Sequence, residues 1–294
     1  MLTKDQFHQK IADGVRFLDG ATGSNLQKMG MMRGCCTEEW ILANPEKLVA
    51  LQRAYVQSGS QILYAPTFQA QPIALEKVGL DRRTEDINAH LAALTRSVSP
   101  EVLVAGNLTT LAAFTDSWDE NNFDLLVENY RRQIKGLIDG GVDILAAETL
   151  MYPVEAEAIL TAAELEGASA SMYTFTMQSD GSLFSGRDAA PILQELEQAG
   201  AAAVGFNCVA ADEMTSGLVS KLRRYIKGPL ICKPNAGNPV IGSDGLPQYP
   251  MGAKEFSAIM ADCRTVGATL LGGCCGTTPE HIAATKELIT SASS

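Results

Sequence analysis

Short apolar runs alternate along this chain with longer stretches in which apolar residues recur at helical spacing. A short apolar run between turn residues predicts a buried strand, whereas apolar residues at i, i+3, i+4 and i+7 predict one face of a helix. The predicted strands are residues 15–19, 61–66, 102–107, 142–148, 170–176, 202–208, 229–235 and 268–271.

The predicted helices follow the strands in turn. The clearest ends at Gly140 and Gly141, a usual helix stop. One of its faces is apolar: Phe123, Leu126, Val127, Tyr130, Ile134, Leu137 and Ile138. The other predicted helices are residues 45–59, 82–97, 154–166, 188–198, 214–226, 254–266 and 279–289.

The strand–helix alternation predicts an α/β fold, a single (β/α)8 TIM barrel with parallel strands. We find no linker or low-complexity stretch that would divide the chain, so residues 1–294 are expected to form one domain. An open, doubly wound sheet is the alternative, and it would predict a glycine-rich dinucleotide loop after the first strand. The segment GATG at residues 20–23 is too short for that loop.

Composition narrows the classes of function. The net charge of -11 argues against nucleic acid or an anionic membrane surface as the main partner. No apolar run approaches the roughly 20 residues of a membrane span, and residues 1–8 do not resemble a signal peptide. We therefore expect a cytoplasmic protein. In that reducing compartment the 7 cysteines are expected to be thiols or metal ligands.

Polar residues gather at the predicted carboxyl ends of the strands, where barrels of this kind carry their active sites. They are Asp19, Thr67, Asn107, Glu148, Thr174, Asn207, Cys208, Asn235, Cys274 and Cys275. None of the three histidines, His8, His90 and His281, ends a strand, so neither a Ser-His-Asp triad nor a histidine-rich metal site is expected.

Three cysteines carry the most specific chemistry. Cys274 and Cys275 are adjacent in a glycine-rich turn after the eighth strand, and Cys208 ends the sixth. Two strand spacings of about 4.8 Å separate these strands, so the three side chains can meet at one ion. Three thiolates with an open fourth position indicate a catalytic Zn²⁺ site. The alternative is a buried core thiol at Cys208 and a vicinal disulfide or an incidental pair at the turn.

Several segments lie beside the predicted strand ends: LDGATG at 18–23, ET at 148–149, GFNC at 205–208, KPNAG at 233–237 and GGCCGTTP at 272–279. Together they resemble the homocysteine S-methyltransferase family, over about residues 15–289. Within that family the chain most resembles the homocysteine-binding module of cobalamin-dependent methionine synthase. The resemblance implies zinc-dependent methyl transfer to the thiol of homocysteine, giving methionine.

The resemblance also implies roles for residues of this sequence. Cys208, Cys274 and Cys275 would hold Zn²⁺, with the homocysteine sulfur in the fourth position and the Asn235 oxygen there when no substrate is bound. Glu148 would bind the substrate ammonium, and backbone N–H groups of the loop Asp19, Gly20 and Ala21 would bind its carboxylate. Asn207 is interpreted either as a substrate contact or as a loop hydrogen-bonding residue.

The methyl donor is left open by the sequence. The chain shows no folate or corrinoid module, so the donor is expected to be a methylated corrinoid protein that docks from outside or a small methyl compound. Two other functions remain open: methyl transfer to another small thiol, and a non-catalytic subunit that binds homocysteine. The oligomeric state is not predicted.

Overall fold

Eight parallel strands close into a barrel in the computed structural model, which describes residues 1–112, 122–243 and 247–292. The strands are β1 (Arg16–Phe17), β2 (Ile62–Tyr64), β3 (Leu103–Thr109), β4 (Ile144–Leu150), β5 (Ser171–Phe175), β6 (Ala203–Ala210), β7 (Leu230–Asn235) and β10 (Leu270–Leu271). They run in the order β1-β10-β7-β6-β5-β4-β3-β2, and a parallel bridge from Leu18 to Ile62 joins the two ends of the sheet. The predicted TIM barrel is thereby confirmed.

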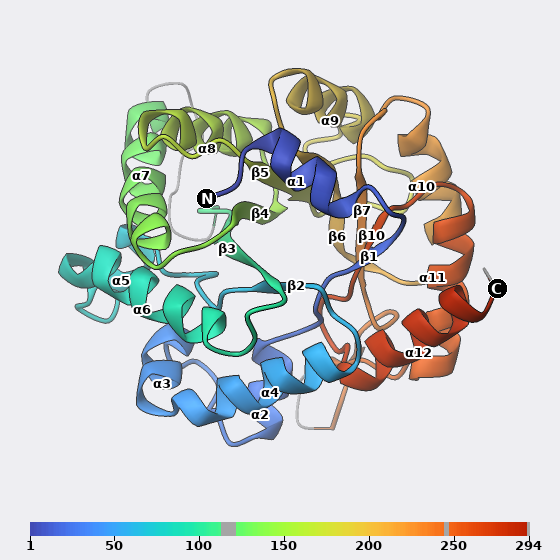
Figure 1. Ribbon diagram of the computed structural model, residues 1–294, viewed down its shortest axis with the longest axis horizontal. Helices are drawn as coiled ribbons and strands as arrows, with labels where there is room; N and C mark the ends of the chain where they lie inside the picture. Colours follow the sequence, from blue (N-terminus) through green and yellow to red (C-terminus); the bar gives the residue numbers. More distant parts are fainter. Residues whose placement is uncertain (113–121, 244–246, 293–294) are drawn as a thin grey trace.

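A ring of helices surrounds the strands (Figure 1). They are α4 (Pro45–Gln57), α6 (Thr84–Arg96), α7 (Phe123–Asp139), α8 (Pro153–Leu165), α9 (Ala189–Gln198), α10 (Thr215–Arg223), α11 (Ala253–Thr265) and α12 (Pro279–Ser291). Each predicted helix is present, with ends displaced by at most a few residues. Among the described residues, no helix combines the length and apolar character that a membrane crossing requires.

The apolar core has two layers, as expected of a barrel whose strands are buried on both faces. An inner cluster fills the barrel and includes Leu18, Ile62, Ile144, Met172 and Leu270. A larger outer cluster joins the strands to the helices. The barrel interior is therefore packed, and only the carboxyl ends of its strands are free to line a pocket.

An N-terminal helix that the strand–helix pattern did not predict, α1 (Lys4–Ile11), covers the amino-terminal end of the barrel. Its Phe7 and Ile11 belong to the inner core cluster, and His8 Nε2 lies 2.7 Å from the carbonyl oxygen of Ala202. The sequence does carry a signal for it, because Thr3 and Gln6 form a capping box. With that end closed, access to the barrel is from the opposite side.

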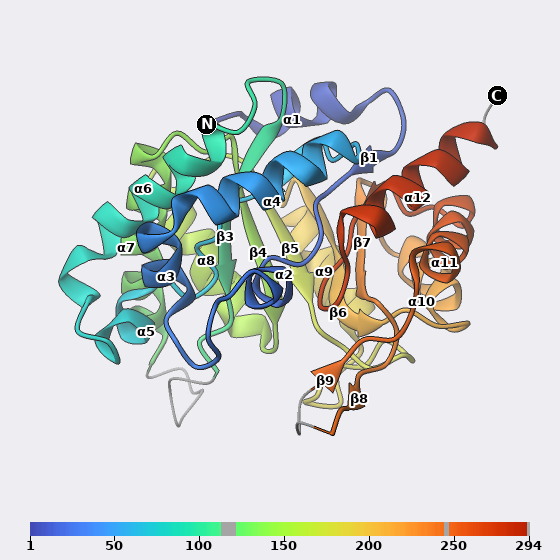
Figure 2. The same ribbon diagram turned by 90° about the horizontal axis from the view of Figure 1, so that it is seen from below.

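Further short elements were also not predicted, and they are inserted into loops that follow strands. These elements are α2 (Gly23–Lys28), α3 (Thr37–Ala43), α5 (Pro72–Glu76), the 3-10 turn η1 (Asp81–Arg83) and the hairpin strands β8 (Val240–Ile241) and β9 (Pro247–Gln248). Figure 2 shows the β8–β9 hairpin at the end of the molecule opposite α1. The chain therefore spends its irregular segments around the open end of the barrel.

Candidate functional site

One cavity of about 420 Å³ opens at the carboxyl ends of the strands. All of the predicted site residues except Asn207 and Asn235 line it. The lining residues are Asp19, Gly20, Ala21, Thr22, Gly23, Ser24, Thr37, Glu38, Tyr64, Ala65, Pro66, Phe68, Gln69, Asn107, Glu148, Thr149, Cys208, Lys233, Cys274 and Cys275. The cavity thus joins segments from almost the whole length of the chain.

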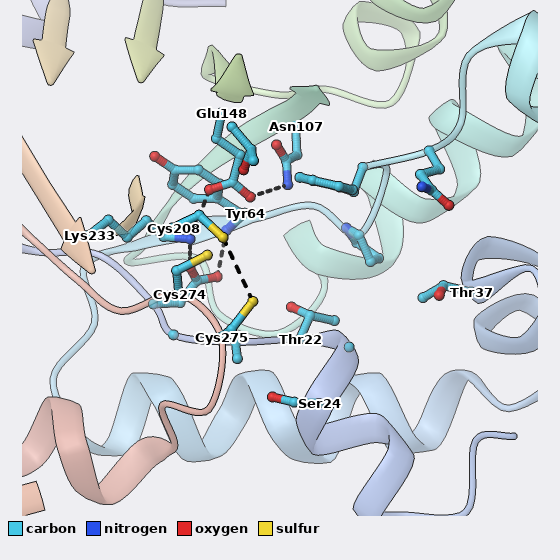
Figure 3. A pocket seen from close by; sticks show the side chains of 18 of the residues that line it. Thr22, Ser24, Thr37, Tyr64, Asn107, Glu148, Cys208, Lys233, Cys274 and Cys275 are labelled. Atoms are coloured by element: carbon cyan, nitrogen blue, oxygen red, sulfur yellow. Dashed lines mark hydrogen bonds and ion pairs between the residues drawn. The ribbon is translucent and has the colours of Figure 1, made fainter. Parts of the chain in front are cut away.

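The three predicted zinc ligands converge on one side of this cavity (Figure 3). The Sγ atoms of Cys208, Cys274 and Cys275 all lie within 4.8 Å of one another, and those of Cys208 and Cys275 are 4.0 Å apart. A tetrahedral Zn²⁺ with bonds near 2.3 Å places its sulfur ligands about 3.8 Å apart. The three thiols therefore fit a zinc ion with little movement, and no other such group exists among the described residues.

Hydrogen bonding among the three thiols makes them unequal acids. Cys275 accepts from Cys208 and Cys274, and this lowers the pKa of its thiol to about 3. Cys208 bonds to Cys274 and Cys275, and these bonds together with burial raise its pKa above the usual range. The thiolate is the form of cysteine that binds metals. Cys275 is therefore the sulfur best prepared to take the ion first.

Strained backbone aims Cys208 into the cavity. The only non-glycine residues with positive φ in the described part of the chain are Cys208 at 58° and Thr149 at 60°. Each lies where the register of its strand shifts, between Asn207 and Ala210 in β6 and between Ala147 and Leu150 in β4. Bulges of this kind re-aim side chains near active sites, and each such conformation costs on the order of 1–3 kcal/mol.

Asn207 connects the two irregular strand ends. Its Oδ1 accepts hydrogen bonds from the Thr149 amide at 2.7 Å and from Thr174 Oγ1 at 2.9 Å. Its Nδ2 donates to Thr149 Oγ1 at 2.7 Å, and lies 3.5 Å from Glu148 Oε2 and 3.8 Å from Cys274 Sγ. The side chain is fully buried. The structure thus places Asn207 behind the cavity, where it fixes its neighbours, and not on the cavity wall.

Backbone hydrogen bonds hold the cysteine turn on the end of β7. The Cys274 amide donates to the Pro234 carbonyl at 2.7 Å, and the Ala236 amide donates to the Cys275 carbonyl at 2.9 Å. Asn235 Oδ1 accepts from the Cys275 amide at 3.0 Å. Asn235 is not among the residues that line the cavity, and the oxygen that was expected to approach the metal instead anchors one of its ligands.

The loop of Asp19, Gly20 and Ala21 is tied to the same turn. The Ala21 amide donates to Thr277 Oγ1 at 3.1 Å, and Thr277 Oγ1 donates to the Cys274 carbonyl at 2.7 Å. A Cβ atom at Gly20 would lie 2.7 Å from Thr277 Oγ1, so only glycine fits there. One of the amides that was expected to bind the substrate carboxylate therefore already has a partner within the protein.

A buried group of charges lines the side of the cavity beyond the cysteines. Lys233 Nζ donates to Glu148 Oε2 at 3.0 Å, lies 4.0 Å from Asp19 Oδ1, and is 4.5 Å from the centre of the Tyr64 ring. Asn107 Nδ2 donates to Glu148 Oε1 at 2.9 Å. The sequence interpretation had not identified Lys233 as a site residue. A signal was available, because a lysine within an otherwise apolar strand is buried only at a cost.

Charge and burial oppose one another within this group. Burial works against the charged form of Lys233, but the carboxylates of Glu148 and Asp19 outweigh it and raise the lysine pKa well above its ordinary value. Burial raises the pKa of Asp19 to about 7, although Lys233 and the Tyr64 amide act in the opposite direction. Lys233 is therefore a permanent cation, whereas Asp19 changes its charge near neutral pH.

The remaining cysteines lie outside the thiol cluster. Cys232 and Cys263 are fully buried in the core, as the sequence suggested. Cys36 Sγ lies 3.6 Å from Glu38 Oε2, and burial raises the pKa of this thiol to about 11. Cys35 is also partly exposed and reduced.

Comparison with known sequences gives one family and two close descriptions. The model of the homocysteine S-methyltransferase family matches residues 16–289. Methionine synthase of Mycobacterium leprae is 25% identical over 292 residues, which are 93% of this chain and 24% of that protein. Methionine synthase of Mycobacterium tuberculosis is 26% identical over 297 residues, covering 95% of this chain and 24% of that protein. The chain thus spans about a quarter of the length of these relatives.

Comparison with solved structures shows the same fold. The homocysteine methyltransferase MmuM from Escherichia coli in its metallated form gives a TM-score of 0.82 at 24% identity, with 96% of this chain and 99% of that chain covered. Its oxidized form gives a TM-score of 0.79 with 93% of this chain and 96% of that chain covered, again at 24% identity. A methyltransferase from Methanosarcina mazei gives 0.65 at 14% identity, with both chains covered completely.

Proposed function

Because the chain belongs to the homocysteine S-methyltransferase family, we propose that it transfers a methyl group to the thiol of homocysteine, giving methionine. The observation that carries the proposal is the meeting of two unlike groups on one cavity. Three convergent thiols lie on one side, and a buried cluster of charges suited to an amino acid lies on the other.

Zn²⁺ is the metal that we propose for the thiol side, with Cys208, Cys274 and Cys275 as ligands. The support is the donor set, because three thiolates at this spacing suit zinc and leave the fourth position open for a substrate sulfur. When bound there, zinc would favour the deprotonated form of a coordinated thiol at neutral pH. No histidine or carboxylate belongs to the cluster, so no other ligand among the described residues competes for the ion.

The distance between the two sides suits a thiol amino acid. Asn207 Nδ2 lies 3.8 Å from Cys274 Sγ and 3.5 Å from Glu148 Oε2, so sulfur and carboxylate are separated by no more than these two distances together. In homocysteine three carbon atoms separate the sulfur from the ammonium. A substrate whose sulfur lies at the cysteines can therefore place its ammonium at Glu148.

The chain's own residues bind and orient the acceptor. Glu148 presents a carboxylate to the ammonium, and the loop of Asp19, Gly20 and Ala21 forms the adjoining wall. Asn207 and Asn235 keep Cys274 and Cys275 in register with that wall. In the transfer, the S–H bond of the acceptor loses its proton, a new S–CH₃ bond forms, and the electron pair of the broken bond leaves with the donor.

The donor is proposed as a methylated corrinoid protein or a small methyl compound. The test is a screen in which reduced, zinc-loaded protein is mixed with homocysteine and each donor, and methionine is measured by mass spectrometry. A Cys275→Ala variant serves as the matched control. Methionine with one donor and none with the control supports the proposal. Homocysteine binding without transfer from any donor would make this a binding subunit, and transfer to a different thiol would change the acceptor.

A further inference from the structure

Lys233 is a buried cation with unused hydrogen-bonding capacity on the cavity wall. Its side chain is only 4% exposed, and the residue nevertheless lines the cavity. An ammonium group has three N–H donors. Among the described residues Lys233 Nζ makes one hydrogen bond, to Glu148 Oε2, while Asp19 Oδ1 at 4.0 Å is beyond hydrogen-bonding range. Figure 3 shows Lys233, Glu148, Tyr64 and the cysteines facing the same space.

Two oxygens on the same wall have the opposite deficiency. Asp19 Oδ1 and Asn107 Oδ1 are buried and have no hydrogen-bond donor. The other Asp19 oxygen accepts from the Tyr64 amide at 2.8 Å, and the Asn107 amide nitrogen donates to Glu148, which fixes the direction of its oxygen. Buried polar atoms in native proteins nearly always have partners, so each unpartnered one calls for an explanation. A ligand that brings N–H donors into the cavity provides it.

We propose that Lys233 receives the carboxylate of the acceptor thiol, while the unpartnered oxygens of Asp19 and Asn107 receive its ammonium beside Glu148. This assignment rests on the proposed function and makes the acceptor a zwitterionic amino acid recognised at both charges by side chains. Each free donor and acceptor in the cluster then has a partner of matching charge. The Ala21 amide is not needed for the carboxylate, because Thr277 Oγ1 already accepts its hydrogen bond.

The test removes the ligand's two charges one at a time. Homocysteine is compared with 3-mercaptopropylamine, which lacks the carboxylate, and with 4-mercaptobutyrate, which lacks the ammonium. Binding to the zinc-loaded protein is measured by calorimetry. Charge-assisted hydrogen bonds of this kind change affinity by about tenfold to a hundredfold. Both analogues are therefore expected to bind the unaltered protein more weakly than homocysteine by factors in that range.

Two variants then assign each charge to its partner. In Lys233→Met the penalty for removing the ligand's carboxylate should fall to about threefold or less, while the penalty for removing its ammonium persists. In Asn107→Ala the reverse pattern is expected. If Lys233→Met keeps the full carboxylate penalty, backbone amides bind that group and the assignment of Lys233 is wrong.

A paired variant covers the risk that the lone substitution destabilises the protein. Lys233→Met leaves Glu148 buried without its cation, whereas Lys233→Met with Glu148→Gln removes both charges together. The carboxylate penalty should vanish in the double variant as well, with circular dichroism and zinc content unchanged. If the unaltered protein binds none of the three thiols, the proposed function fails, and the assignment fails with it. Homocysteine binding with an unchanged carboxylate penalty in both variants overturns the assignment alone.

Discussion

The two sides of the cavity are built in different ways. The thiol side consists of three partly exposed cysteines, held by strained backbone at Cys208 and by backbone hydrogen bonds at Cys274 and Cys275. The charged side consists of side chains that are almost fully buried and satisfy much of one another's charge. The thiol side is therefore completed by an ion from outside, whereas the charged side is organised by the protein itself. Substitutions on one side should leave the other intact.

The largest effect is expected on the thiol side, from Cys275→Ala. Removing one of three sulfur ligands should lower the zinc content from about one ion per chain to a small fraction of that, and methyl transfer should fall at least about a hundredfold. The barrel has its own core, so circular dichroism should not change. Zinc is measured by elemental analysis on reduced protein.

Cys36→Ala is the matched control for that variant. Cys36 is also a partly buried thiol, but it lies outside the cluster and should keep both zinc and activity. Full zinc occupancy in Cys275→Ala would show that the ion is held elsewhere and would remove the difference between the two sides of the cavity.

A smaller effect is expected on the charged side, from Glu148→Gln. Glu148 carries the negative charge nearest to Lys233 and accepts a hydrogen bond from Asn107. The variant should weaken homocysteine binding by roughly ten- to a hundredfold, as expected for a charged hydrogen bond. Zinc content should remain the same on the same preparation. Loss of zinc in this variant would make Glu148 a metal ligand, contrary to the separation of the two sides.

The fold and the thiol side could be predicted from the sequence because both depend on position along a repeating pattern. Each strand ends at a recognisable turn, and a barrel brings all those ends to one face. Cys208, Cys274 and Cys275 could therefore be placed together from their strands alone. The helix α1 was missed because it precedes the repeat, although Thr3 and Gln6 carry its capping signal.

The charged side was harder to predict because its contacts depend on geometry that no periodic pattern encodes. Lys233 precedes the last residues of β7 and pairs with Glu148 of β4, three strands away in the sheet. The turning of Asn207 and Asn235 away from the cavity follows from local details, a register shift in β6 and a backbone donor at Cys275. Such details decide the direction of a side chain without leaving a periodic trace.

An intermediate effect on both sides at once is expected from Asn207→Ala, because Asn207 alone touches both. The variant removes the hydrogen bonds that hold Thr149 in its positive-φ conformation and the contact with Cys274. Affinity for zinc and for homocysteine should each fall by several-fold, and stability by about 1–3 kcal/mol. Asn129→Ala, which alters a buried asparagine on α7 that does not line the cavity, is the control for stability alone. An effect on only one of the two ligands would show that Asn207 does not couple the sides.

The smallest effect is on stability, and it comes from Asp19→Asn. Burial raises the Asp19 pKa from 3.8 to about 7, so the folded protein binds a proton here that the unfolded chain has released. This carboxyl group therefore reduces stability progressively as the pH rises from about 4 to 7, and its full cost is present above pH 7. An asparagine side chain can still accept from the Tyr64 amide without carrying that charge. Asp19→Asn should consequently raise the melting temperature at pH 8 by a few degrees, for a gain on the order of 2 kcal/mol, and by less at pH 5.5. Thermal unfolding at both pH values measures this difference, and homocysteine affinity at pH 8 should fall at the same time. A melting temperature that falls at pH 8, or a gain that is larger at pH 5.5, would mean that Asp19 stabilises the folded protein as a paired anion. The charged side would then owe its organisation to Asp19 as well as to the pair of Glu148 and Lys233.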